Sequence, residues 1–100
     1  MCKNGNMITQ DFERTLAIVS EVTEIEKENI LSSCRQMEYV EARVLFIKAL
    51  SEQGYHYSVI AKKMGRAVSS IKALLDGFDN RDSLIFRKLH SEITRKLQGK

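Results

Sequence analysis

The chain has no proline and no tryptophan among its 100 residues, and it has only two cysteines. Proline interrupts helices, and about 5 would be usual in a chain of this length, so its absence favours long helical runs joined by turns of Gly, Asn, Asp and Ser. Cys2 and Cys34 lie far apart, and neither has a partner at the spacing of metal ligands. The sequence therefore indicates neither a zinc site nor a disulfide framework.

Long apolar runs are also absent, so no stretch of the sequence predicts a membrane span. The first residues, MCKNGNM, contain no apolar segment of the kind that a secretory signal needs, and we expect a cytoplasmic protein without a membrane partner. With 43% hydrophobic and 29% charged residues, the composition is that of a folded domain. We expect a flexible N-terminus over residues 1–8 and a single helical domain over residues 9–100.

The patterns that catalysis requires are missing as well. His56 and His90 have no set of cysteines or carboxylates at metal-ligand spacing, and the phosphate-binding pattern GxxxxGK followed by Ser or Thr does not occur. Isolated histidines are more often structural or exposed than catalytic. The sequence predicts a protein that is not an enzyme and that has no cofactor, no metal and no small-molecule substrate.

Charge of one sign is unevenly distributed along the chain. Residues 1–50 hold 6 Lys+Arg and 8 Asp+Glu, a net charge of −2, whereas residues 51–100 hold 10 Lys+Arg and 5 Asp+Glu, a net charge of +5. The basic second half favours a polyanionic partner, and a solvated lysine-rich surface is an equally good interpretation of charge alone.

Apolar residues at spacings of three and four predict amphipathic helices over residues 9–22, 40–51, 68–78 and 84–97. Shorter helices are expected over 23–31, where Thr23 and Glu26 form a capping-box pattern, and over 58–64, where Ser58 is the expected cap. The polar stretch 33–38 is expected to be a loop. The last helix is expected to direct an apolar face inward, made of Leu84, Ile85, Leu89, Ile93 and Leu97. The fold class is therefore all-α, a compact bundle of five to six short helices.

Residues 57–78 have the layout of a helix-turn-helix, with two short helices separated by a turn at Gly65. On a helical wheel, the apolar residues of the second helix gather around Ile71, and Ser69 and Ala73 lie on the opposite side. Short hydrogen-bonding side chains suit a helix that enters the major groove of DNA. The second helix, starting near Ala67, is therefore the candidate recognition helix, although the same geometry also occurs in purely structural three-helix cores.

Three segments carry a resemblance to the C-terminal DNA-binding domain of the bacterial replication initiator DnaA, over roughly residues 12–97. The matching segments are Val40-Glu41-Ala42-Arg43, Ile60-Ala61 and Gly65-Arg66-Ala67-Val68-Ser69-Ser70-Ile71. The resemblance implies a helix-turn-helix fold of the Trp-repressor and DnaA type that binds double-stranded DNA, without the ATPase module. In the family an Asp-His pair helps to read the origin repeat, and here Ala67-Val68 stands in its place. We expect a regulator, or an accessory factor of replication or of a mobile element.

The resemblance also assigns roles to two arginines. Arg43 matches a family arginine that contacts the DNA backbone, and Arg35 falls where the family has a minor-groove arginine. The helical wheel leaves a second interpretation open for Arg43, a partly buried arginine that pairs with a carboxylate. Arg66, just before the candidate recognition helix, is expected to contact a phosphate or a guanine.

The remaining candidate DNA contacts are polar side chains on or beside the two helices of the motif. They are Lys62, Lys63, Ser69, Ser70 and Lys72. Val68 is expected to belong to the core rather than to meet a thymine methyl group. A different class of function stays open, a protein–protein interaction module that kept the fold and lost specific DNA binding. A second copy of the chain or another protein is then the candidate partner.

Overall fold

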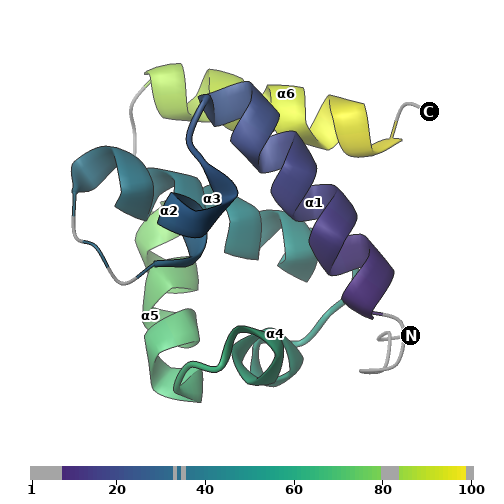
Figure 1. Ribbon diagram of the computed structural model, residues 1–100, viewed down its shortest axis with the longest axis vertical. Helices are drawn as coiled ribbons and strands as arrows, with labels where there is room; N and C mark the ends of the chain where they lie inside the picture. The colour runs from purple at the N-terminus through teal and green to yellow at the C-terminus, as the bar shows by residue number, and fades with distance from the viewer. Residues whose placement is uncertain (1–7, 33, 35, 80–83, 99–100) are drawn as a thin grey trace.

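The computed structural model describes residues 8–32, 34, 36–79 and 84–98, and the secondary structure over these residues is helical (Figure 1). The helices are α1 Ile8–Thr23, α2 Lys27–Leu31, α3 Met37–Glu52, α4 Tyr57–Met64, α5 Val68–Asp79 and α6 Leu84–Gln98. The expected all-α bundle is confirmed. The N-terminal segment expected to be flexible, 1–8, lies outside the described residues except for Ile8, with which α1 begins.

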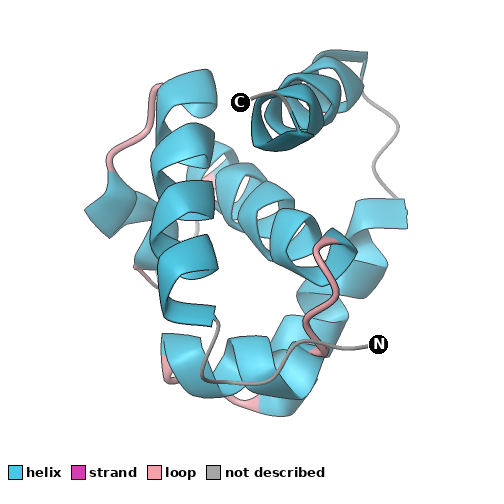
Figure 2. Ribbon diagram, turned by 90° about the vertical axis from the view of Figure 1, so that its right-hand side faces the viewer, coloured by secondary structure: helices cyan, strands magenta, loops and turns pink. Residues whose placement is uncertain are grey.

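Helix α3 is the centre of the arrangement, and α1, α2, α4, α5 and α6 all pack against it. Figure 1 shows α6 along the top of the molecule and α4 at the bottom, and Figure 2, turned by 90°, keeps these two helices at opposite ends. α4 and α5 also pack against each other. The radius of gyration is 12.4 Å, close to the value of about 13 Å for a compact domain of this length.

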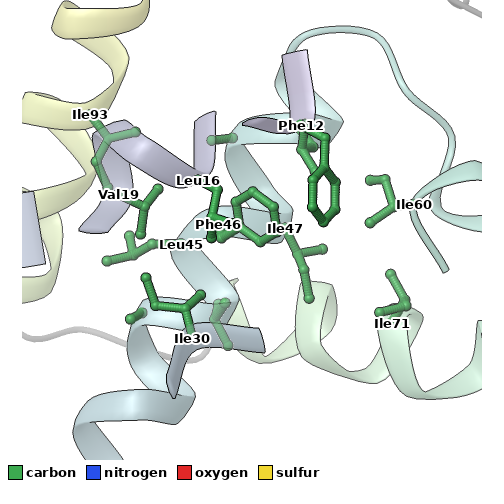
Figure 3. Packing of buried hydrophobic residues seen from close by; sticks show 14 of the residues in the cluster. Phe12, Leu16, Val19, Ile30, Leu45, Phe46, Ile47, Ile60, Ile71 and Ile93 are labelled. Carbon is green, nitrogen blue, oxygen red and sulfur yellow. The ribbon is translucent and has the colours of Figure 1, made fainter. Parts of the chain in front are cut away.

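The core surrounds α3 on every side rather than on one face. The consecutive residues Val44, Leu45, Phe46 and Ile47 are all 0% exposed. Phe12 of α1 meets the Phe46 ring edge-on, with ring centroids 5.0 Å apart, and Figure 3 shows side chains from the surrounding helices converging on the same cluster. The amphipathic pattern predicts a single buried face for α3, and this prediction is wrong for the middle of the helix, where five other helices cover residues 42–47.

The two ends of α4 are capped in different ways. At its start the His56 side chain, not Ser58, is the cap, and the His56 Nδ1 atom accepts a hydrogen bond from the Ser58 backbone N–H at 3.2 Å. At its end Gly65 adopts the left-handed conformation with φ 70°. The N–H groups of Gly65 and Arg66 donate to the carbonyls of Lys62 and Ala61. This paired pattern ends α4 at the expected glycine and turns the chain into α5.

The segment before α3 differs from the sequence prediction in two places. Thr23 does not cap α2, since its hydroxyl donates to the Val19 carbonyl at 2.6 Å and belongs to the last turn of α1. α3 begins at Met37, so the last two residues of the expected loop 33–38 are helical. The carboxylate of Glu38 lies in the first turn of α3, where the helix dipole favours a negative charge.

Helix α6 buries the expected face at Leu89, Ile93 and Leu97, and the prediction is wrong only for the first turn, where Phe86 is buried in place of Leu84 and Ile85. Phe86 is 2% and Ile93 0% exposed, whereas Leu84 is 68% and Ile85 71% exposed. At 100° per residue Phe86 lies within about 20° of Ile93, while Leu84 lies on the opposite side of the helix.

Among the described residues, no helix combines the length and the apolar character that a membrane span requires.

Candidate nucleic-acid interface

Helix α5 presents a face of short polar side chains to solvent. Ile71 is 0% exposed and anchors the helix in the core, whereas Ser69, Lys72 and Ala73 are exposed, as the helical wheel predicts. Ser70 is exposed as well. The serine hydroxyls can donate and accept hydrogen bonds, and the small side chains let the helix backbone approach another surface closely.

The start of α5 is open. Ala67 accepts the first hydrogen bonds of the helix through its carbonyl, from the N–H groups of Ser70 and Ile71, and its methyl side chain offers no acceptor to the N–H groups of the first turn. Val68 is 43% exposed, so its assignment to the core is wrong. The reason is its position in the first turn of α5, beyond the neighbours that cover Ile71.

Two lysines at the end of α4 precede α5 by a few residues in the sequence. Lys62 and Lys63 are both exposed and occupy the last turn of the helix, where a positive charge complements the helix dipole. The Lys63 Nζ atom lies 5.6 Å from the centre of the Phe12 ring of α1, a cation–π contact that steadies the side chain. The α4–α5 unit therefore carries exposed ammonium groups at Lys62, Lys63 and Lys72.

Arg66 is directed into the protein. Its Nη2 atom donates to the carbonyls of Leu31 at 2.9 Å and Ser32 at 2.6 Å, and the side chain is half-buried. These two carbonyls belong to the C-terminal end of α2, where helix carbonyls lack intrahelical partners. Arg66 thus fastens the turn before α5 to α2, and it is a positioning residue for α5 rather than an extended phosphate contact.

Arg43 is more deeply buried, with 4% of its surface exposed. Its Nε atom donates to the Ile30 carbonyl at 2.8 Å, and its Nη2 atom donates to the carbonyls of Asn29 at 3.3 Å and Cys34 at 3.2 Å. Burial lowers the pKa of the Arg43 guanidinium, and the positive charge of Arg66 lowers it further. Of the two interpretations of Arg43, burial is correct, but its partners are carbonyls instead of a carboxylate, and this burial removes Arg43 from the DNA contacts that we propose.

The two arginines together form an arginine clamp, by which we mean Arg43 and Arg66 on the carbonyl end of α2. The sequence does not predict the clamp because the acceptors lie in α2 or just after it, 9 to 35 residues away from their donors. One feature of the sequence does indicate a structural role for Arg43. It lies in an otherwise apolar stretch of α3, and a buried charge needs hydrogen-bond partners. Arg35, the expected minor-groove contact, lies outside the described residues.

The aromatic cluster before α4 is divided between core and surface. Tyr55 is 2% exposed, and its hydroxyl donates to Asp11 Oδ2 at 2.6 Å, which ties the segment between α3 and α4 to α1. Burial raises the pKa of the Tyr55 hydroxyl, and the hydrogen bond to Asp11 raises it further. His56 stacks on Tyr57 with ring centroids 4.1 Å apart. This cluster has a structural role.

Among the described residues no group of His, Cys, Asp and Glu side chains could hold a metal ion. His90 instead pairs with Glu52 at 3.0 Å between Nε2 and Oε1. Comparison with protein-family models, with curated proteins and with solved structures finds no match to this chain. The resemblance to the DnaA C-terminal domain stays a hypothesis, and the case for a function depends on the residues themselves.

Proposed function

We propose that this chain binds double-stranded DNA through α4 and α5, used as a helix-turn-helix with α5 in the major groove. The observation that carries the proposal is the exposed face of α5, which is made of Ser69, Ser70, Lys72 and Ala73. A helix can approach base edges only where its outward side chains are short or can form hydrogen bonds, and this face meets both conditions.

The surroundings of α5 support the same proposal. We propose that the exposed Lys62 and Lys63 at the end of α4 contact the phosphates that flank the groove, with Lys63 leaving its contact with the Phe12 ring to do so. The side chain of Ala67 offers no acceptor to the first N–H groups of α5, which favours a phosphate at the helix N-terminus. Arg66 serves the interface indirectly, because its hydrogen bonds to α2 hold the turn from which α5 starts. Asp76, exposed two turns along α5, repels phosphate and limits the contact to the first two turns.

The base sequence that is read differs, in this proposal, from the origin repeat of the DnaA family. The family's Asp-His pair is replaced by Ala67-Val68, which offers no hydrogen-bonding side chain. Val68 is 43% exposed and can contact a thymine methyl group at the edge of the groove. We propose a regulator of replication or transcription, or an accessory factor of a mobile element, that acts without ATP hydrolysis.

Titration of a labelled duplex, followed by fluorescence anisotropy, tests the proposal with a matched pair of lysine variants. Lys72→Ala should weaken duplex binding roughly fivefold, which corresponds to about 1 kcal/mol for one phosphate contact. Lys88→Ala removes another exposed lysine, from α6 at the opposite end of the molecule, and should leave affinity nearly unchanged. Equal losses for both variants would mean that the protein attracts DNA only through its overall charge.

A further inference from the structure

A groove of about 620 Å³ lies between the first turns of α3 and the middle of α5. Its walls are mostly apolar, with Met37 and Val40 from α3 and Ala73 and Leu74 from α5. Met37 is 68% exposed, an unusual position for a large apolar side chain at the start of a helix. We refer to this feature as the α3–α5 groove.

The arginine clamp lines the same groove, beside Ser70. The hydrogen bonds of Arg43 and Arg66 go to backbone carbonyls, and neither guanidinium has a carboxylate partner among the described residues. Arg43 Nη1 and Arg66 Nη1 likewise receive no acceptor from the part of the chain that the structure describes. Two adjacent positive charges, one of them 96% buried, therefore face an open groove without a counterion among the described residues.

We propose that the α3–α5 groove binds an acidic, apolar peptide segment of a partner protein. A carboxylate of the segment pairs with Arg66 and Arg43, and its neighbouring apolar side chains pack on Met37, Val40 and Leu74. A guanidinium can form two parallel hydrogen bonds to a carboxylate, and the carboxylate supplies the negative charge that the groove lacks. The apolar walls select a peptide, because a sugar–phosphate backbone would leave them uncovered.

Shape favours the same occupant over DNA. Arg43 lines the groove but is only 4% exposed, so we expect a slender side chain such as Asp or Glu, projecting from a peptide, to reach its guanidinium. The phosphates of a duplex lie on a convex surface and meet protrusions more readily than recessed groups. The proposal does not depend on DNA binding by the outer face of α5, although Ser70 and Ala73 border both surfaces.

The test selects peptides from a displayed random library on the full chain and measures the Kd of the enriched peptide by fluorescence anisotropy. We expect the enriched peptides to share an Asp or Glu flanked by apolar residues. Met37→Glu places a carboxylate on the groove wall and should raise the Kd about tenfold or more by repulsion. Leu84→Glu is the matched control, because Leu84 is also 68% exposed and also opens a helix, and it should leave the Kd unchanged.

Both variants alter exposed side chains, so each should keep the wild-type unfolding transition, which is measured alongside. The proposal is overturned if the library yields no peptide, if the enriched peptides lack a shared acid, or if the two variants raise the Kd equally. It is also overturned if no peptide is enriched while Met37→Glu abolishes duplex binding, since the groove would then accommodate a phosphodiester backbone.

Discussion

Arg43 brings a positive charge into the core of the molecule, and three backbone carbonyls from the α2 region accept its hydrogen bonds. Arg66 adds two more carbonyls at the same helix end. The carbonyl end of the short α2 therefore receives hydrogen bonds from Arg43 of α3 and from Arg66 of the turn between α4 and α5. At the scale of single residues, the arginine clamp is what places α5 relative to α2 and α3.

Arg43→Ala should lower the free energy of unfolding by about 3 kcal/mol, because buried carbonyls lose charged donors and the side chain leaves a space behind. Arg95→Ala is the control, since Arg95 is exposed on α6 and its loss should cost less than about 0.5 kcal/mol. Urea unfolding measures both values. Equal stabilities of the two variants would show that the clamp contributes nothing to the fold.

Tyr55 makes stability depend on pH at the alkaline end. Its pKa is raised in the folded protein above the ordinary value of 10.0, so the unfolded state loses the proton first as the pH rises. The stabilisation is therefore complete below about pH 10 and declines above it. Tyr55→Phe should flatten this decline, as measured by urea unfolding between neutral and strongly alkaline pH. An unchanged alkaline decline in the variant would assign the effect to other groups.

The glycine at the end of α4 and the glycine inside α5 are expected to respond in opposite ways to the same substitution. Gly65 has φ +70°, and a Cβ there would meet nothing within 4 Å, so Gly65→Ala should destabilise by about 1 kcal/mol through backbone strain alone. Gly77 lies within α5 and also has open space, so Gly77→Ala should stabilise by about 0.5–1 kcal/mol. Thermal unfolding of both variants measures the two changes in stability. Changes of the same sign would contradict the left-handed turn at Gly65.

Helix positions followed from the sequence because apolar periodicity is a local property. The stripe around Ile71 predicted both the burial of that residue and the exposure of Ser69 and Ala73. Helix ends and caps were predicted less well. The apolar periodicity of α4 is the same whether His56 or Ser58 caps the helix, and in the structure His56 is the cap. The roles of Arg43 and Arg66 depend on carbonyls of a distant helix, and no local pattern contains that information.

The basic residues of the second half of the chain lie at two opposite ends of the molecule. Exposed lysines of α4 and α5 lie at one end, and the exposed basic residues of α6 lie at the other, Arg87, Lys88, Arg95 and Lys96 among them. A single duplex that contacts α5 therefore meets only some of the 10 Lys and Arg residues of the second half of the chain. The account predicts modest affinity that depends on three lysines, Lys62, Lys63 and Lys72.

The salt dependence of duplex binding is the sharpest measurement of whether α4 and α5 contact DNA through their lysines. Each neutralised phosphate contributes about −0.9 to the slope of log K against log salt concentration, so three lysine contacts predict a slope of about −3. The variant that combines Lys62→Ala and Lys63→Ala should reduce the slope to about −1 while leaving the fold intact. Affinity for duplex DNA that is absent at low salt, or a slope that the double variant leaves unchanged, would contradict the proposed interface.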